Sequence, residues 1–462
     1  MESFYQSESK KSKIGNRIVD ESVFQGNFIE YFRTKGSDIF ARTQPYVDWV
    51  TKQKDLELWL YDKRTMSAPM AECKGVDEYG NEFYGPNFAS ADYMGLSHHP
   101  SAKEAAIKAL TEYGIGSGGS PLAFGVHKYY TQLRLELANH WDVKGVIIYS
   151  TGWLAAYGVI KGLIREHDHV ILDNLAHNCL REGASNSTKN IHMVDHLSNQ
   201  AMIQKMKEIR EKRPKDGILV VTEGLFSMDS DTPDLNELQQ ECKKYKAFLM
   251  IDCAHDFGCM GATGKGTWEL QNLKDKSNVI FTATGSKSFS TNVGFAGCDD
   301  LNVIEYLKIF STPYMFINSI SPIQAATALA NLRVIRGEEG RQRRERVQTL
   351  CKYARKKFEE KGFKCLGYPS PILPVLIGNE VVTKIAVRLM LDEGVVVNGI
   401  EFPVVSKGQA RLRVCIMPLH EEKHIDVLVE TFERCYKKSI EIFAKCISPE
   451  VAKKYGMEIP KL

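Results

Sequence analysis

The chain has 462 residues, of which 43% are hydrophobic and 25% are charged, the profile of an ordinary soluble globular protein. Its 60 lysines and arginines nearly balance its 57 aspartates and glutamates, which argues against a partner such as nucleic acid or an anionic membrane surface. The 11 cysteines are scattered without a Cys-x-x-Cys pair, so reduced thiols are favoured over a disulfide framework, and no metal site is expected.

The N-terminal sequence, MESFYQSESKKSKIGN, is polar and lacks the apolar region of a secretory signal. No stretch approaches the ~20 apolar residues that a membrane span needs. We therefore expect a cytoplasmic protein with no transmembrane segment. Residues 24–60 show helix-like spacing of aromatic side chains, and residues 72–84 carry turn residues between short runs, as a hairpin does. Residues 1–85 are thus predicted to form an N-terminal extension that ends in a hairpin.

Between about residues 86 and 335, short apolar runs alternate with longer amphipathic stretches. This rhythm predicts a large α/β domain in which helices cover both faces of a mostly parallel central sheet. Several runs end in a polar residue, and ligands of such sheets bind beyond the carboxyl ends of the strands. The predicted strands cover residues 146–149, 170–172, 191–194, 218–221, 248–251, 279–281 and 294–296.

After residue 335 the pattern changes to a charged helix over residues 336–362. Three short apolar runs and a last helix, to about residue 444, follow it. This part of the chain, residues 336–462, is predicted to form a smaller C-terminal α+β domain. Its expected strands cover residues 372–377, 395–397 and 411–416.

Two glycine-rich segments imitate nucleotide-binding motifs. Residues 114–119 satisfy Gly-x-Gly-x-x-Gly, but a helix rather than an apolar strand is predicted before them. Residues 261–267 hint at a phosphate loop, but their spacing fails that pattern. We expect neither segment to bind a nucleotide.

Two strand ends carry the charged residues that most suggest chemistry. One apolar strand ends at Asp252, and a buried carboxylate requires a cation or hydrogen-bond donors. A helix N-cap, a metal shared with His255 and Asp256, and the protonated nitrogen of a pyridine ring are the alternatives. Lys287 follows another strand among Thr, Gly and Ser residues, where partial desolvation would make its amine a nucleophile that forms a Schiff base. A surface lysine is the alternative there.

Two further strand ends extend this constellation. The strand at 146–149 runs through a small polar turn, residues 150–153, into a predicted helix whose free backbone N–H groups suit a phosphate. His177 follows the strand at 170–172, where its imidazole could lie flat on an aromatic ring or act as a structural hydrogen-bonding group.

The phosphate turn, His177, Asp252 with His255, and Lys287 occur in an order that resembles a fold-type I pyridoxal phosphate transferase, the aspartate aminotransferase-like fold. More closely, the chain resembles the α-oxoamine synthases, which include serine palmitoyltransferase, 2-amino-3-ketobutyrate CoA ligase (glycine C-acetyltransferase), 8-amino-7-oxononanoate synthase and 5-aminolevulinate synthase. The likeness covers roughly residues 85–440. The pieces that carry it are NFASADYMGLSHHP (87–100), DNLAHNCLREGA (173–184), VTEGLFSMDSD (221–231), IDCAHDFGCMG (251–261), PYMFINSISP (313–322) and FPVVSKGQARLRVCIMPLH (402–420).

The resemblance implies a role for each matched residue. Lys287 would bind pyridoxal 5'-phosphate as a Schiff base and, once released, would take the Cα proton of the substrate. Asp252 would pair with the pyridinium nitrogen, and His177 would stack on the ring. His255 would contact the ring hydroxyl, assisted by Ser227.

The phosphate contacts implied by the resemblance come from several segments. Gly152 and Trp153 would meet the phosphate or the ring edge through their backbone, and Thr284 would bind the phosphate. Asn318 or Ser319 of a second subunit would assist, which implies a homodimer with shared active sites.

The substrate contacts that the resemblance implies are harder to assign, because two arginines compete for one role and two positions depart from the family pattern. Arg413 would hold the carboxylate of the amino acid, with Arg411 as the competing choice. The family usually has asparagine where this chain has Asp92, and many members have arginine where it has Pro121. Both departures bear on substrate handling, so Asp92 is expected at the substrate, and the substrate's identity stays open.

The resemblance implies decarboxylative condensation of serine, glycine or alanine with an acyl-CoA, which gives an α-amino ketone, CoA and CO2. The aromatic N-terminal segment ranks a serine palmitoyltransferase-like enzyme of sphingolipid biosynthesis first. The alternatives are glycine C-acetyltransferase and 8-amino-7-oxononanoate synthase. A non-catalytic subunit with the same fold belongs to a different class, and in this family it would lack the Schiff-base lysine that is present here as Lys287.

Overall fold

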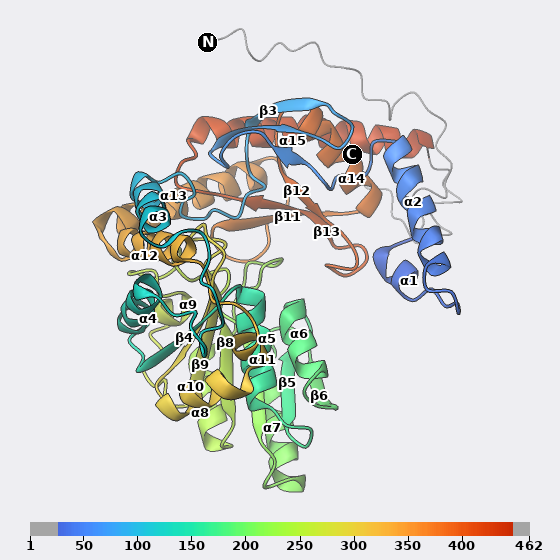
Figure 1. Ribbon diagram of the computed structural model, residues 1–462. Coiled ribbons are helices and arrows are strands. Elements are labelled where there is room, and N and C mark those ends of the chain that lie inside the picture. Colours follow the sequence, from blue (N-terminus) through green and yellow to red (C-terminus); the bar gives the residue numbers. More distant parts are fainter. Residues whose placement is uncertain (1–25, 447–462) are drawn as a thin grey trace. The chain divides into compact units, whose positions relative to one another are not determined.

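The computed structural model describes residues 26–446 (Figure 1). The polar segment on which the absence of a secretory signal was predicted lies outside the described residues. The structure groups the chain into two compact units: unit 1 is Met1–Ser90 with Gln348–Leu462, and unit 2 is Ala91–Val347. In the described part of the chain, no helix is long and apolar enough to cross a membrane.

Unit 2 is built on one seven-stranded sheet, and it confirms the predicted fold class and all seven predicted strands. The strands are β4 (Gly145–Tyr149), β5 (His169–Asp173), β6 (Asn190–Val194), β7 (Ile218–Glu223), β8 (Phe248–Asp252), β9 (Val279–Thr284) and β10 (Gly294–Cys298). Their order is β4-β10-β9-β8-β7-β5-β6. β10 is antiparallel to both neighbours, and the pairs from β9 to β6 are parallel.

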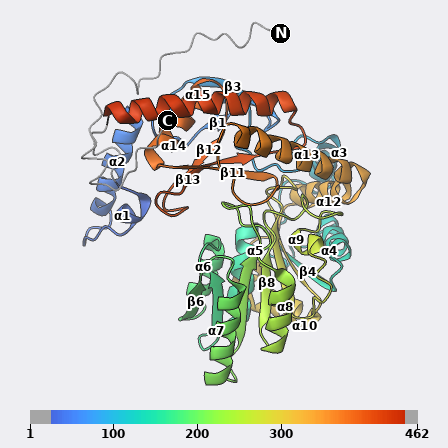
Figure 2. The same cartoon turned by 180° about the vertical axis from the view of Figure 1, so that it is seen from behind.

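Helices cover both faces of this sheet. α5 and α6 lie over one face and α7 and α8 over the other, as Figures 1 and 2 show from opposite sides. The strands other than the edge strand β6 are therefore buried along their length, which explains their near-continuous apolar runs. The helices of the unit are α3 (Pro100–Tyr113), α4 (Lys128–Trp141), α5 (Gly152–Leu163), α6 (Asn178–Ser185), α7 (Asn199–Lys212), α8 (Leu235–Lys244), α9 (Thr267–Leu270), α10 (Leu301–Phe310), α11 (Thr312–Met315), α12 (Pro322–Arg336) and the start of α13 (Glu338–Glu360).

The parallel strands end at one edge of the sheet, and the last residues of β5, β7, β8 and β9 are polar. In the ladder, Glu223 of β7 pairs with Asp252 of β8, and Asp252 pairs with Thr282 of β9. The register therefore brings residues that are far apart in the sequence to neighbouring strand ends, where ligands of α/β sheets bind.

Unit 1 contains two antiparallel three-stranded sheets, β1-β2-β3 and β11-β13-β12. The hairpin predicted at residues 72–84 is present as β2 and β3. The elements are α1 (Phe28–Phe32), η3 (Ala41–Thr43), α2 (Gln44–Asp55), β1 (Arg64–Thr65), β2 (Glu72–Val76), β3 (Glu82–Pro86), the end of α13, β11 (Ile372–Gly378), α14 (Glu380–Asp392), β12 (Asn398–Ile400), β13 (Ala410–Cys415) and α15 (Glu422–Cys446).

One predicted strand of unit 1 is displaced. The apolar run at 395–397 was predicted as a strand of the C-terminal domain, but β12 begins at Asn398. The run instead follows the first part of the chain: Val396 donates to the carbonyl of Pro86 at 2.9 Å, and Phe88 donates to the carbonyl of Val396 at 2.8 Å. A pairing partner so distant in the sequence cannot be read from the apolar pattern.

Candidate active site

Two carboxylates lie side by side at the carboxyl ends of β7 and β8. Glu223 and Asp252 are 3% and 5% exposed. Asp252 Oδ1 accepts the backbone N–H of Ala254 at 3.1 Å, and Glu223 Oε1 accepts that of His177 at 2.7 Å. Burial raises the pKa of Asp252 to about 6, and burial together with Asp252 raises the pKa of Glu223 well above its usual range. A cation at this place would be strongly favoured.

Lys287 lies in the turn after β9 and is half-buried. Its ammonium group opposes the effect of burial on three side chains, lowering the pKa of Asp252, Glu223 and Cys179. The structure therefore brings the lysine and the aspartate predicted from distant segments into one site. Glu223, the last residue of β7, joins them there, and no role was predicted for it.

The N-terminus of α5 forms a cradle with the end of β9. The hydroxyl of Thr151 accepts the backbone N–H of Leu154 at 3.2 Å and caps the helix. Gly152 packs so tightly that a Cβ there would lie 2.3 Å from the Cβ of Thr284. The hydroxyls of Thr284 and Ser286 lie 2.8 Å apart. A helix N-terminus beside two hydroxyls suits a phosphate group, and Ser286 is an addition to the predicted contacts.

Trp153 and His177 both have exposed side chains. Trp153 stacks on Tyr157, with ring centroids 5.2 Å apart, and its predicted backbone contact stays a prediction. His177 begins α6, where its Nδ1 accepts the backbone N–H of Cys179 at 3.3 Å. The imidazole is thus hydrogen-bonded to the first turn of its own helix, and its stacking on a cofactor ring stays a prediction.

His255 is buried three residues beyond Asp252, and its Nδ1 lies 2.9 Å from the hydroxyl of Tyr93. Tyr93 is fully buried and belongs to the ADYMGL piece, but no role was predicted for it. Ser227 lies half-buried in the turn after β7.

His196 clamps two loops that carry site residues. Its Nδ1 lies 3.0 Å from Asp173, which ends β5 four residues before His177. Its Nε2 lies 3.2 Å from Asp231, four residues after Ser227. Burial disfavours the imidazolium, but the hydrogen bonds to both carboxylates outweigh it and raise the pKa of His196 to about 10. The sequence did not single out this clamp, because its three members are separated by more than twenty residues each.

Asp92 and the two residues expected from a second subunit also lie in unit 2. The carboxylate of Asp92 accepts hydrogen bonds within the unit, so its predicted substrate contact stays a prediction. Asn318 is exposed after α11. Ser319 is held against the glycine-rich segment, because its N–H donates to the carbonyl of Gly119 at 2.9 Å and its carbonyl accepts the hydroxyl of Ser117 at 2.9 Å.

Arg411 and Arg413 lie on β13 of unit 1. They are two residues apart and therefore point to the same face of the strand. Arg411 is 3% exposed, and its Nε donates to the carbonyl of Gln409 at 2.9 Å. Arg413 is half-buried and so more accessible, which favours it over Arg411 as the ligand of a carboxylate.

Thiols near the site are not poised to react. Cys179, Cys253 and Cys259 are buried, and burial raises the pKa of each thiol. A buried thiol with a raised pKa is a poor nucleophile. Among residues 26–446, no three His, Cys, Asp or Glu side chains gather in a metal-binding arrangement.

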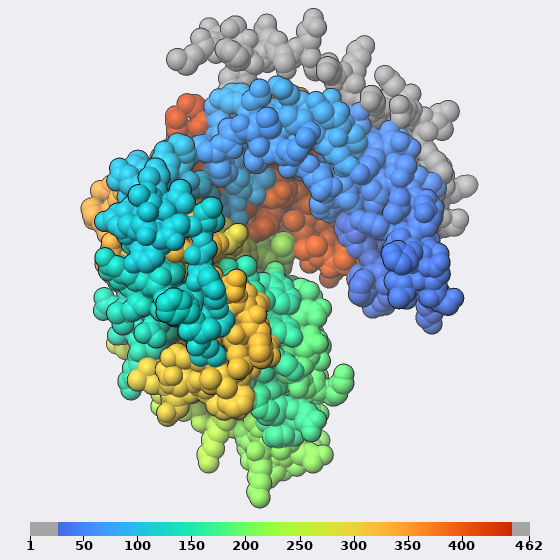
Figure 3. Space-filling view, viewed as in Figure 1, coloured from blue at the N-terminus to red at the C-terminus, as the bar shows by residue number. Residues whose placement is uncertain are grey.

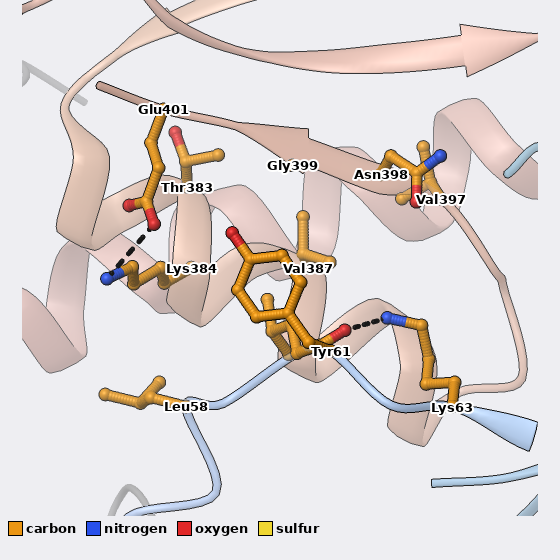
Figure 4. A pocket seen from close by; sticks show the side chains of 11 residues that line it. Leu58, Tyr61, Lys63, Thr383, Lys384, Val387, Val397, Asn398, Gly399 and Glu401 are labelled. Carbon is orange, nitrogen blue, oxygen red and sulfur yellow. Dashed lines mark hydrogen bonds and ion pairs between the residues drawn. The ribbon is translucent and has the colours of Figure 1, made fainter. Parts of the chain in front are cut away.

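Unit 1 holds a pocket of about 80 Å³ that the sequence did not predict (Figure 4). Its charged groups are already paired: Lys384 lies 3.2 Å from Glu401, and Lys63 donates to the carbonyl of Leu60. Burial and Glu401 raise the pKa of Tyr61 to about 12. The lining favours no particular class of ligand. It consists of Leu58, Leu60, Tyr61, Lys63, Thr383, Lys384, Val387, Val397, Asn398, Gly399 and Glu401.

Comparison with known proteins defines the class of this site. Residues 86–432 match the family model for aminotransferase class I and II, and the chain belongs to this family of pyridoxal phosphate-dependent enzymes. Within it, the chain is an α-oxoamine synthase, an acyltransferase. The 8-amino-7-oxononanoate synthase of Saccharophagus degradans is 34% identical over 343 residues, which are 74% of this chain and 84% of that protein.

Solved structures share the fold. A serine palmitoyltransferase from Sphingomonas wittichii has a TM-score of 0.80 at 23% identity and covers 87% of this chain and 99% of its own. An 8-amino-7-oxononanoate synthase from Francisella tularensis has a TM-score of 0.63 at 21% identity and covers 78% of this chain and 98% of its own. The sequence relatives thus favour the predicted alternative, 8-amino-7-oxononanoate synthase, over the serine palmitoyltransferase-like enzyme that was ranked first.

The residues present fit pyridoxal phosphate. The cradle between Gly152 and Thr284 has no room for a further carbon atom and offers donors to a phosphate. The buried carboxylate of Asp252 suits a protonated ring nitrogen, and Lys287 is close enough to lower the pKa of Asp252.

Proposed function

We propose that the protein catalyses the condensation of an α-amino acid with an acyl thioester, with loss of CO2. The observation that carries this proposal is the meeting of Lys287, Asp252 and the cradle at Gly152 and Thr284 at adjacent strand ends. When bound, pyridoxal phosphate supplies an electron sink that makes the Cα–H bond of the amino acid acidic.

The chain's own residues would do the rest. Asp252 keeps the ring nitrogen protonated, because its carboxylate favours a cation at this buried place. Lys287 anchors the cofactor covalently and, after the substrate replaces it, takes the Cα proton at Nζ. His177 presents a ring face to the cofactor. Arg413 is proposed to hold the substrate carboxylate.

We infer that alanine and a seven-carbon acyl group are the first candidate substrates. The relatives at 34% and 32% identity are named for 8-amino-7-oxononanoate. In that product the amino-bearing carbon carries a methyl group, so the amino acid that lost CO2 would be alanine. The other seven carbons would come from an acyl group that ends in a carboxylate.

Serine with a long-chain acyl group is the second candidate. The observation that favours it is the greater structural similarity to serine palmitoyltransferase, with a TM-score of 0.80 against 0.63 for the 8-amino-7-oxononanoate synthase. The aromatic segment before residue 62 also supports this candidate.

The test is a CoA-release assay that pairs alanine, serine and glycine with acetyl-CoA, palmitoyl-CoA and the CoA monoester of heptanedioic acid. We expect alanine with the heptanedioyl ester to give a kcat/KM about 10-fold or more above every other pair, the discrimination typical of a pocket that recognises one methylene or hydroxyl. A preference for serine with palmitoyl-CoA would support the second candidate instead. If no pair releases CoA from cofactor-loaded protein, the condensation proposal is wrong.

We also propose that the enzyme is a homodimer. Exposed apolar side chains gather on two segments of unit 2, around residues 115–126 and 316. The two segments are joined by the hydrogen bond from the N–H of Ser319 to the carbonyl of Gly119, and Figure 3 shows cyan and gold surfaces side by side. Phe124 is 93% exposed and Phe316 is 75% exposed, which is unusual for side chains facing water. Asn318 and Ser319 adjoin this patch, as expected if they reach a partner's phosphate site. The members of this apolar patch are Ile115, Leu122, Phe124, Val126 and Phe316.

Sedimentation velocity tests the dimer. The wild-type protein should sediment as a dimer, and Phe124→Asp should shift it toward the monomer, because a charge in a buried interface is costly. Met193→Asp is the matched control, since Met193 is also an exposed apolar residue but lies on the edge strand β6. A wild-type protein that sediments as a monomer at micromolar concentration would contradict the proposal.

A further inference from the structure

Asp92 occupies the position where the resembling enzymes usually have asparagine, and its carboxylate is engaged on both oxygens. Oδ1 accepts the backbone N–H of Leu96 at 3.0 Å and the hydroxyl of Ser290 at 2.6 Å. Oδ2 accepts the backbone N–H of Ser97 at 3.0 Å. The side chain is 6% exposed, so these three donors within unit 2 are its neighbours rather than solvent.

Ser290 closes the turn that carries Lys287. Its backbone N–H donates to the carbonyl of Lys287 at 3.0 Å, and the next residue, Thr291, donates to the carbonyl of Gly285 at 3.0 Å. Ser290 has a φ of +51°, a left-handed conformation that a residue other than glycine adopts only when its surroundings hold it. The hydrogen bond to Asp92 supplies such a hold.

An asparagine could not replace this carboxylate without losing a bond. Donors approach both oxygens of Asp92, whereas an amide has one accepting oxygen and one donating nitrogen. In either orientation of the amide, the backbone N–H of Leu96 or of Ser97 would face an NH2 group. The Ser290 hydroxyl would also lose its ionised acceptor, and charge-assisted O–H···O bonds of this length are the strong ones.

We propose that Asp92 is a positioning residue that acts through Ser290 to fix the turn carrying Lys287, and that it does not contact the substrate. The inference rests on the proposed role of Lys287 as the covalent anchor of the cofactor. A misplacement of about 1 Å in a reacting group costs on the order of 100-fold in rate. Loss of the hydrogen bond that links Asp92 to this turn through Ser290 should therefore have a measurable effect on the rate.

The test uses Asp92→Asn, Ser290→Ala and the double variant, each as holoenzyme. We expect Asp92→Asn to slow the attachment of pyridoxal phosphate to the apoprotein, followed by its visible absorbance, by about 10-fold, and to lower kcat by a similar factor. The KM for the amino acid should change less than about 2-fold, because no substrate contact is lost. Ser290→Ala should reproduce these changes, and the double variant should be no worse than Asp92→Asn, since both act through one hydrogen bond.

Asp168→Asn is the matched control. Asp168 is also buried and accepts backbone N–H groups on both oxygens, from Gly217 and Arg165 at 2.8 Å each, but it precedes β5 at the opposite edge of the sheet. It should lose stability while the attachment rate stays at the wild-type value. Should Asp92→Asn fail to fold, Ser290→Ala alone carries the test.

Two results would overturn the inference. One is a rise of about 10-fold or more in the KM for the amino acid with an unchanged attachment rate in Asp92→Asn, which is the signature of a substrate contact. The other is a Ser290→Ala variant that attaches the cofactor at the wild-type rate. Failure of the Lys287 proposal is a separate result, because it would appear as cofactor that remains attached in Lys287→Ala.

Discussion

Lys287→Ala is expected to lose the visible absorbance of covalently bound pyridoxal phosphate and to lower kcat by at least about 1,000-fold. The substitution removes both the nucleophile that anchors the cofactor and the base that takes the Cα proton, and a positioned base alone is worth about 100- to 10,000-fold. The phosphate cradle and Asp252 remain, so the variant should still bind pyridoxal phosphate without a covalent bond. Absorbance spectra and equilibrium dialysis measure the two properties separately.

Lys276→Ala is the control for this variant. Lys276 is more deeply buried than Lys287 and lies before the opposite end of the same strand, where it pairs with Asp142 at 3.0 Å. Its loss should reduce stability but leave the absorbance in place. An unchanged spectrum in Lys287→Ala would show that another lysine holds the cofactor.

Asp252→Asn is expected to lower kcat by about 100- to 1,000-fold, the usual cost of removing one preorganised charge from an active site. The amide cannot stabilise a protonated ring nitrogen, so the electron sink is weakened. Asp256→Asn is the control: Asp256 is buried four residues further on, but its carboxylate accepts the backbone N–H of Thr267 at 2.6 Å and serves the fold. It should lower stability more than kcat measured on folded protein.

The pH dependence of cofactor affinity gives a second readout for Asp252. Burial raises the pKa of this carboxyl to about 6. Below that pH the carboxyl is protonated and cannot pair with a cation, so cofactor affinity should fall as the pH drops through about 6. Asp252→Asn should lose this dependence. If both proteins show the same fall in affinity, the carboxylate is not the group responsible.

Much of unit 2 could be predicted because its signals are local. Each buried strand is a short apolar run, and each run that ends in a polar residue marks the same edge of the sheet. Asp252 and Lys287 could be assigned to one site from the sequence. A buried carboxylate requires a cation such as a protonated pyridine nitrogen, and a lysine among small residues suits a Schiff base with the same cofactor. The phosphate cradle was expected from a strand that turns into a helix. The structure adds that Gly152 approaches Thr284 too closely for any side chain at residue 152.

What could not be predicted depends on contacts between distant segments. His196 joins Asp173 and Asp231, and each of these residues alone is an ordinary polar loop residue. The hydrogen bond between Asp92 and Ser290 has no local signal either, because 198 residues separate the two. The hydrogen bonds of Val396 to Pro86 and Phe88 could not be predicted for the same reason. The choice between substrates has no local signal either, because it depends on the shape of a binding site.

Borohydride reduction of the pyridoxal phosphate-loaded wild-type protein, followed by peptide mapping, tests the central claim most directly. Reduction makes the bond between cofactor and lysine permanent, so the modified residue can be identified by its mass. We predict one pyridoxyl phosphate group per chain, located on Lys287. A modification on any other lysine, or a protein that takes up no cofactor, would contradict the account.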